Sequence, residues 1–284
     1  MRTIVITGGT HGIGKALALQ YLGRGDQVIA IGSSPARGEA LLAEAGRRGV
    51  FLPVDLSSAA HTIRLGGELR ARYPRIDALV LGAFRYETVR QETAEGLERT
   101  FALYVMSRFL LAEELRPALE QAPRPVVVNL CGTGGRAGRL HWDDLQLRAR
   151  YRPTAAIMQG ARANDLLGVA FSEAHSGTPV RYVLHNPVFV DTGLAEPFRL
   201  PKRAAVQVAV KLFAAPVDRA IEPVVARIDT PPEATLSAFR GRRTVDVTGP
   251  AFDPAAARRL TGVLREMARP SGGAAVSLTG DRQP

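Results

Sequence analysis

A glycine-rich turn near the start of the chain limits the folds that this sequence can adopt. A β-branched run at residues 3–7 leads into Gly8-Gly9-Thr10-His11-Gly12-Ile13-Gly14, and an apolar-periodic segment follows at 13–23. Gly8 can turn the chain tightly, Gly12 can leave the backbone open to close approach, and Gly14 can let a helix pack close to a strand. The three glycines therefore predict a strand–turn–helix unit, the building block of α/β folds.

Beyond the turn, strand-like and helix-like segments alternate along most of the chain. Apolar runs that predict strands lie at 27–31, 50–55, 77–83, 125–131 and 180–186. Helices are expected over 13–23, 36–48, 58–72, 93–119 and 153–175. Buried strands that alternate with helices indicate a parallel sheet covered on both faces. We therefore predict one α/β domain over residues 1–268, a Rossmann-type doubly wound parallel sheet, and a disordered tail at 269–284.

The chain is strongly basic, with 37 Lys and Arg against 27 Asp and Glu and a net charge of +10. Only three of the 37 are lysines, and the densest basic group is Arg240, Arg242 and Arg243. The other arginines are dispersed, and aromatic residues that could stack bases do not alternate with them. We therefore expect a solvated basic surface and no nucleic-acid partner.

Other features of the composition bear on location and metals. No apolar run approaches the ~20 residues that a membrane-spanning helix needs, and the start MRTIVITGG has no charged-then-apolar leader. The single cysteine, Cys131, cannot form an internal disulfide, which fits a reducing compartment. We expect a cytoplasmic protein without a membrane partner, and the spacing of the five histidines predicts no metal site.

The glycine turn also predicts a ligand. Amides at the N-terminus of the following helix would face the turn, where they can bind the pyrophosphate of a dinucleotide. The second strand ends in Ile31-Gly32-Ser33-Ser34, without the acidic residue that would bind the ribose 2′-hydroxyl of NAD. Ser33, Ser34, Arg37 and His11 could instead receive a 2′-phosphate, which favours NADP(H), although Arg37 could also be simply an exposed helix residue.

These motifs resemble the short-chain dehydrogenase/reductase (SDR) superfamily over residues 1 to about 268. The tight spacing of the turn carries the resemblance, and segments 95–98, 100–103, 109–111 and 143–146 with Tyr151 are similar to the retinol-dehydrogenase-like branch. The resemblance implies that Asp55 and Leu56 contact adenine, that Thr192 holds the nicotinamide amide, and that a substrate lid covers about 192–215. The predicted cofactor site consists of Gly8, Thr10, His11, Gly12, Ile13, Gly14, Ser33, Ser34, Arg37, Asp55, Leu56, Ala83, Pro187, Val190 and Thr192.

The positions of the family's catalytic tetrad are degenerate. The resemblance places Ile157 and Ala161 where the family has a Tyr and a Lys on one helical face. It places Gly132 at the catalytic Ser and Tyr104 at the Asn that orders a proton-relay water. Phe84 replaces a glycine beside the expected cofactor. No lysine lies four residues after a tyrosine; an arginine does so at Tyr86/Arg90 and Tyr104/Arg108, but neither pair lies on the expected helix.

The small and apolar replacements predict a roomy substrate pocket lined by Cys131, Gly132, Thr133, Ile157 and Ala161, and a largely apolar small-molecule substrate. Tyr104, His141 and Tyr151 are the candidates for proton transfer. Each also has a structural alternative: Tyr104 could be a buried interface aromatic, and the other two could be loop residues. Cys131 could be a nucleophile or a core residue.

Three functions remain open from the sequence. The first is an enzyme of non-redox chemistry, such as cyclisation, isomerisation or dehydration, in a biosynthetic pathway. The second is an atypical NADPH-dependent reductase of an acceptor that needs no proton donor, such as an iminium ion or a quinone-like compound. The third is a non-catalytic NADP(H)-binding subunit of an active homologue. The resemblance also implies a homodimer or homotetramer built on helices 93–119 and 153–175.

Overall fold

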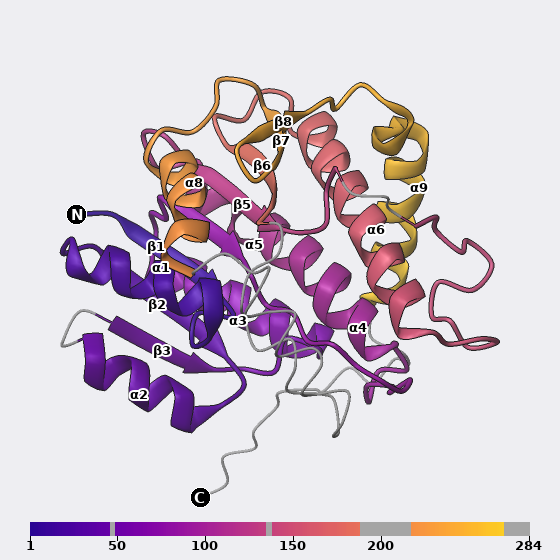
Figure 1. Cartoon of the computed structure of the whole chain (residues 1–284), viewed down its shortest axis with the longest axis horizontal. Coiled ribbons are helices and arrows are strands. Elements are labelled where there is room, and N and C mark those ends of the chain that lie inside the picture. The colour runs from indigo at the N-terminus through magenta and orange to yellow at the C-terminus, as the bar shows by residue number, and fades with distance from the viewer. Residues whose placement is uncertain (46–48, 135–137, 188–216, 270–284) are drawn as a thin grey trace, which may run out of the picture.

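The strand that precedes the glycine turn, β1 (Thr3–Thr7), lies inside an eight-stranded sheet (Figure 1). The strand order is β3 (Gly49–Pro53), β2 (Gln27–Gly32), β1, β4 (Ala78–Leu81), β5 (Val126–Leu130), β6 (Arg181–Asn186), β7 (Leu236–Arg240) and β8 (Arg243–Val245). Neighbouring strands pair in parallel, except that β7 and β8 form an antiparallel hairpin. The predicted α/β Rossmann-type doubly wound sheet in a single domain is confirmed.

The computed structural model describes residues 1–45, 49–134, 138–187 and 217–269. Val190, Thr192, the predicted lid at 192–215 and the predicted tail beyond Arg269 lie outside the described residues.

Helices cover both faces of the sheet (Figure 1). On one face lie α1 (Gly12–Gly23), α2 (Pro35–Ala45) and α8 (Val217–Asp229), and on the other lie α3 (Ala59–Arg72), α5 (Ser107–Leu119), α6 (Pro153–Ala174) and α9 (Pro254–Met267). Alternate side chains of β1 enter the two cores: Ile4 and Ile6 pack with α1 and α8, and Val5 packs with α3 and α5. Because both faces are buried, the central strands β1, β4 and β5 consist largely of apolar residues.

The helix expected over 93–119 begins later than predicted. A turn occupies residues 93–96, where Gly96 has a φ of +78°. The Glu98 carboxylate then caps the helical segment, since it accepts hydrogen bonds from the amides of Thr100 and Phe101 at 2.8 Å. The segment runs as α4 (Arg99–Phe101), a π-helical stretch (Ala102–Met106) and α5. The capping carboxylate is the physical reason for the later start.

The C-terminal elements were not predicted from the sequence. α8, β7, β8, a short 3-10 helix (Pro250–Phe252) and α9 follow the last predicted strand. α9 packs along α6, as Figure 1 shows, and residues 163–171 of α6 are all buried. α9 therefore covers part of the helix through which the resemblance implies assembly, and the homodimer or homotetramer stays a prediction.

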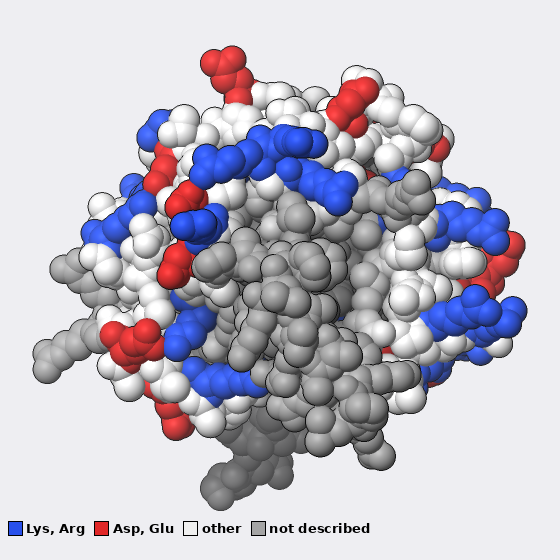
Figure 2. All heavy atoms as spheres, viewed as in Figure 1, with Lys and Arg blue, Asp and Glu red and all other residues white. Residues whose placement is uncertain are grey.

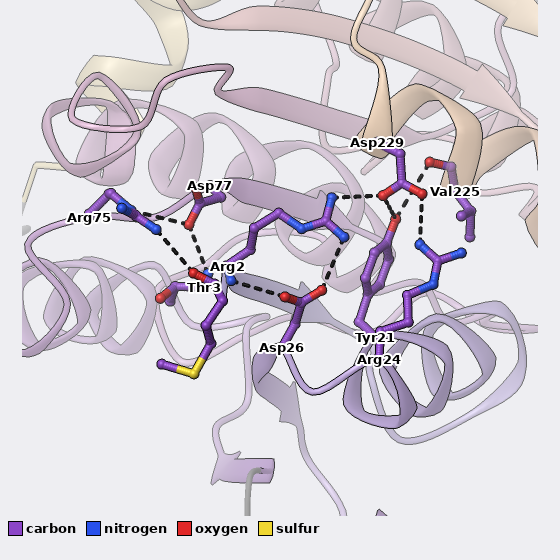
Figure 3. A network of polar contacts seen from close by, with 10 residues as sticks. Arg2, Thr3, Tyr21, Arg24, Asp26, Arg75, Asp77, Val225 and Asp229 are labelled. Atoms are coloured by element: carbon purple, nitrogen blue, oxygen red, sulfur yellow. Dashed lines mark hydrogen bonds and ion pairs between the residues drawn. The ribbon is translucent and has the colours of Figure 1, made fainter.

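A network of charged side chains joins β1 to two helices at the edge opposite the glycine turn (Figure 3). The Arg2 guanidinium donates to Asp26 at 3.0 Å and to Asp229, the last residue of α8, at 2.7 Å. Asp229 also accepts hydrogen bonds from Arg24 at 2.7 Å and from the Tyr21 hydroxyl at 3.2 Å. Partial burial raises the pKa of Asp229, but the hydrogen bonds from Arg2 and Arg24 outweigh it and hold that pKa below its ordinary value. Asp229 therefore ties α8 to α1 and to the start of the sheet.

We expect Asp229→Asn to lower the free energy of unfolding at pH 7 by about 1–3 kcal/mol, because three donors lose a charged acceptor. The carboxylate's contribution is present above its unfolded pKa, about 3.9, and is lost as the pH falls through the depressed folded value. Urea unfolding at pH 7 and near pH 3 measures both effects. The control is Glu39→Gln, an exposed carboxyl on α2. A difference in free energy of unfolding between Asp229→Asn and wild type that stays constant down to pH 3 would contradict the stabilising role of the Asp229 carboxylate.

Candidate functional site

The glycine loop has the geometry that the sequence predicts. Gly8 and Gly12 have φ values of +68° and +51°, which side chains rarely allow. The Gly8 amide donates to the Ile31 carbonyl at 2.8 Å, which holds the loop at the end of β2. A Cβ on Gly14 would lie 2.2 Å from the Gly8 oxygen, so only glycine lets α1 begin this close to the loop.

The N-terminus of α1 fits a phosphate group. His11 occupies the N-cap position without a side-chain cap hydrogen bond, and the first turn contains no acidic residue. The first-turn amides therefore present the positive end of the helix dipole beside the loop, with no acidic residue in that turn. This arrangement suits the pyrophosphate of a dinucleotide.

The residues predicted for the adenosine end lie at the carboxyl ends of β2 and β3. Ser33 and Arg37 are exposed, and the Arg37 amide donates to the Ser34 hydroxyl at 3.4 Å. A Cβ on Gly32 would lie 2.9 Å from the Thr10 hydroxyl, so the loop packs directly on the end of β2.

Asp55 follows β3 with its carboxylate half exposed. Burial raises its pKa, but hydrogen bonds from the Ser57 hydroxyl and amide, at 2.7 and 2.9 Å, outweigh this and lower the pKa below its ordinary value. Leu56 is buried, whereas Asp55 presents an ionised carboxylate at the edge where the resemblance places adenine.

Tyr104 is buried in the interior. Its residue is 5% exposed, and its hydroxyl accepts a hydrogen bond from the Gly132 amide at 3.1 Å. Phe84 packs edge-on against its ring with centroids 5.0 Å apart, and the Arg108 guanidinium lies 4.5 Å from the ring centroid. Burial raises the pKa of Tyr104 far above its ordinary value, so its phenol stays protonated at neutral pH.

The residues at the predicted tetrad positions are closely packed against one another. A Cβ on Gly132 would lie 2.8 Å from the Ala161 Cβ, so α6 closes onto the end of β5 where a serine would stand. A Cβ on Gly160 would lie 2.4 Å from a carbon of the Tyr104 ring. The large Tyr104 and the small Gly132, Gly160 and Ala161 therefore compensate for one another in volume.

The other predicted pocket residues are placed as follows. Cys131 and Thr133 are buried, and Ile157 is half-buried. Burial raises the pKa of the Cys131 thiol to about 12, which leaves it a poor nucleophile. The structure thus brings Cys131, Gly132, Thr133 and Ala161 close together, and their role as a substrate pocket stays a prediction.

The two loop candidates for proton transfer make structural contacts. The Tyr151 hydroxyl donates to the Glu87 carbonyl at 3.2 Å, and the His141 amide donates to the Gln159 side chain at 2.9 Å. Ala83, predicted at the cofactor, is buried at the end of β4, and Pro187 follows β6. A catalytic role for His141 or Tyr151 stays a prediction.

A buried polar network, which the sequence reading missed, lies beneath Tyr104. Arg108 is 1% exposed and donates to the Ala83 carbonyl at 3.0 Å, to the Leu130 carbonyl at 2.7 Å and to the Asn129 side chain. Asn129 in turn donates to Asn164 at 2.8 Å. Burial lowers the pKa of Arg108. The Tyr104/Arg108 spacing was the available signal, because residues four apart share a helix face.

Among the described residues no cluster of three metal-ligating side chains occurs. Within the same residues no helix is both long and apolar enough to cross a bilayer.

The compensation in volume predicts an unusual response to a helix-favouring substitution. Gly160→Ala should lower the free energy of unfolding by about 1–3 kcal/mol because its methyl group overlaps Tyr104, although Ala is about 1 kcal/mol better than Gly in a helix. In a Tyr104→Ala background the same change should be neutral or stabilising. Gly262→Ala in α9, where a Cβ meets nothing within 4 Å, is the control and should stabilise the fold. Equal effects of Gly160→Ala in both backgrounds would rule out the contact.

Asp165 on α6 predicts a pH dependence. Its carboxylate is buried, with Arg162 3.5 Å away; burial raises the pKa of Asp165 to about 6, and contacts with Thr133 and Arg162 offset only part of the rise. A folded pKa above the unfolded value, about 3.9, means that stability falls as the pH rises from 4 through 6. The free energy of unfolding of Asp165→Asn, taken relative to that of wild type, should rise by about 2–3 kcal/mol between pH 4 and pH 7.5. Chemical unfolding across this pH range tests the prediction, with a variant of an exposed carboxyl, Asp246→Asn, as the control. A difference in free energy of unfolding between Asp165→Asn and wild type that does not change with pH would refute the prediction.

Comparisons with known proteins agree with this fold and loop. The family model described as short chain dehydrogenase matches residues 2–143, half of the chain. DnrU of Streptomyces sp. (strain C5), named as a daunorubicin C-13 ketoreductase, is 28% identical over 91% of this chain and 90% of its own length. Mouse retinol dehydrogenase 14 is 26% identical over 70% of this chain, and the match spans 64% of that relative. A crystal structure of a protein from Mycobacterium paratuberculosis superposes with a TM-score of 0.74 at 23% identity, covering 94% of this chain and 93% of that one. The predicted resemblance is confirmed: this chain belongs to the short-chain dehydrogenase/reductase superfamily and has retinol-dehydrogenase-like relatives.

Proposed function

We propose that this chain binds a nicotinamide dinucleotide, with NADP(H) preferred over NAD(H), and catalyses non-redox chemistry on a small, largely apolar molecule. Cyclisation, isomerisation and dehydration are the reaction classes that fit. The observation that carries the proposal is the filled tetrad: Tyr104 occupies the space above Gly160, and Ala161 closes onto Gly132.

The nucleotide half of the proposal rests on the loop. The left-handed Gly8 and Gly12, the N-terminus of α1 without an acidic residue in its first turn, and the exposed Asp55 together suit a dinucleotide. No carboxylate follows β2, and Ser33, Ser34 and Arg37 lie there instead, which supports a preference for a 2′-phosphate. When bound, a nicotinamide can supply or accept a hydride.

The chemical half of the proposal rests on proton transfer. Carbonyl reduction needs a donor for the forming alkoxide, and general acid–base groups contribute roughly 10²–10⁴-fold to such reactions. Ile157 and Ala161 cannot supply a proton, and Tyr104 is buried with its hydroxyl on Gly132. Phe84, 42% exposed at the end of β4, offers an apolar surface that can orient a substrate and exclude water.

A second function is favoured by one observation. Cys131, Thr133 and Ala161 are each at most 7% exposed, which would also suit a non-catalytic NADP(H)-binding subunit. Such a subunit would bind nucleotide without converting any small molecule.

Calorimetric titration with NADPH and NADH tests the nucleotide half, and we expect NADPH to bind more tightly. Gly14→Ala should abolish binding, because its methyl group would overlap the Gly8 oxygen, whereas Gly23→Ala on the same helix meets nothing within 4 Å and should leave binding unchanged. With simple ketones and aldehydes we expect no steady NADPH oxidation at an ordinary kcat of ~1–10³ s⁻¹.

Three results would contradict this assignment. Steady ketone reduction would indicate an ordinary reductase, and absence of nucleotide binding would contradict the proposed dinucleotide site. NADPH oxidation only with iminium or quinone-like acceptors would favour the atypical reductase.

A further inference from the structure

Two arginines face each other across the β7–β8 hairpin. The strands are joined by Gly241 and Arg242, and Arg240 pairs directly with Arg243 in the antiparallel register. Gly241 has a φ of +58°, as the first central residue of a tight type II′ hairpin requires. Directly opposed residues project from the same face of a sheet, with Cβ atoms roughly 5 Å apart. The hairpin therefore places two arginine side chains opposite each other on one face of the sheet.

The pair lies on the Tyr104 side of the sheet. Arg240 is two residues beyond Ala238, which is buried in the core that contains Tyr104, and alternate strand residues share a face. A Cβ on Gly134, just after β5, would lie 3.6 Å from the Cβ of Arg240. Arg242 lies on the opposite side, where it binds Glu222 of α8 at 2.7 Å.

Hydrogen bonds tie the hairpin to the loop that follows Gly132. The Asn186 side chain at the end of β6 donates to the Thr133 carbonyl at 2.9 Å, and the Asn186 carbonyl accepts from the Gly241 amide at 2.8 Å. Arg227 also donates to the Gly241 carbonyl at 3.3 Å. The arginine pair is thus built into the carboxyl edge of the sheet, where open α/β folds bind their ligands.

The arrangement costs stability in the absence of an anion. Like charges directly opposite each other across a hairpin repel. Arg240 and Arg243 are exposed, and among the described residues neither forms an ion pair or hydrogen bond through its guanidinium. Figure 2 shows basic side chains gathered over this end of the sheet.

We propose that Arg240 and Arg243 bind an oxyanion group of the substrate, which makes that substrate an apolar molecule with a carboxylate or phosphate rather than a neutral one. The inference rests on the proposed function, because it takes the small molecule to lie at this edge. Two planar guanidinium groups can bind the oxygens of a carboxylate or a phosphate with charge-assisted hydrogen bonds. The apolar part would then extend toward Phe84, which is the exposed aromatic residue at the end of β4.

Matched probes separate the charge from the apolar body. We would titrate nucleotide-free protein with 1-naphthylacetate, 1-naphthyl phosphate and the neutral 1-naphthylacetamide by calorimetry. Arg240→Gln/Arg243→Gln should weaken binding of the preferred anion roughly tenfold or more and leave the amide unchanged. The control is Arg64→Gln/Arg124→Gln, which removes the same charge from two exposed positions elsewhere. The ratio of the two anions distinguishes a carboxylate from a phosphate ligand.

Stability gives a second, independent readout. Arg243→Gln should raise Tm by about 1–3 °C at low ionic strength, because it removes a like-charge contact, while it weakens anion binding. A purely structural arginine would lower Tm when replaced.

The possible outcomes separate this inference from the function on which it rests. Anion binding that is equal in wild type and in the Arg240/Arg243 double variant overturns the inference alone. Equal loss of the anions and the amide in that double variant overturns it too, since charge would not be what the pair recognises. No binding of any probe to the wild type overturns the proposed small-molecule site itself.

Discussion

The buried Arg108 guanidinium organises the part of this structure where chemistry would occur. It bonds the carbonyl groups of Ala83 and Leu130, at the ends of β4 and β5, and the side chain of Asn129. Its acceptors are neutral, so the positive charge is retained beneath the sheet edge at a cost in desolvation. The Tyr104 ring makes a cation–π contact with this guanidinium, and the Tyr104 hydroxyl accepts a hydrogen bond from the Gly132 amide. The ends of two strands, the π-helical segment and α6 are therefore held in one arrangement.

The residues at the predicted tetrad positions fit one another in volume. A tyrosine in place of a small amide needs the space that Gly160 leaves on α6. With Ala161 in place of a long side chain, α6 can approach β5 until only glycine fits at position 132. Each replacement is compatible with the others, because a close-packed interior cannot absorb one of them alone. The site is thus an alternative packing of the edge rather than an emptied version of the family's site.

The two ends of the carboxyl edge are built differently. Around Gly8 and Gly12 the backbone supplies the geometry, and it suits the phosphates of a nucleotide. From β4 to the β7–β8 hairpin, side chains supply it: Phe84 after β4 is apolar and exposed, and the hairpin presents Arg240 and Arg243. The proposed ligand of this second region would meet an apolar surface and a pair of cations. Asp165 on α6 is buried, and burial raises its pKa to about 6.

The sequence by itself determined the glycine loop, the parallel sheet and the absence of a Tyr–Lys pair, because these depend on local spacing: three glycines between a strand and a helix, and residues four apart on one face. What it left open lies where distant segments meet. Only the packing of α6 on β5 shows how closely Gly132 and Ala161 approach each other. Likewise Arg240 and Arg243 look like one solvated basic run with Arg242. Strand pairing places these two on the Tyr104 side and Arg242 on the other, because alternate residues of a strand point to opposite faces and a two-residue turn sets which ones meet.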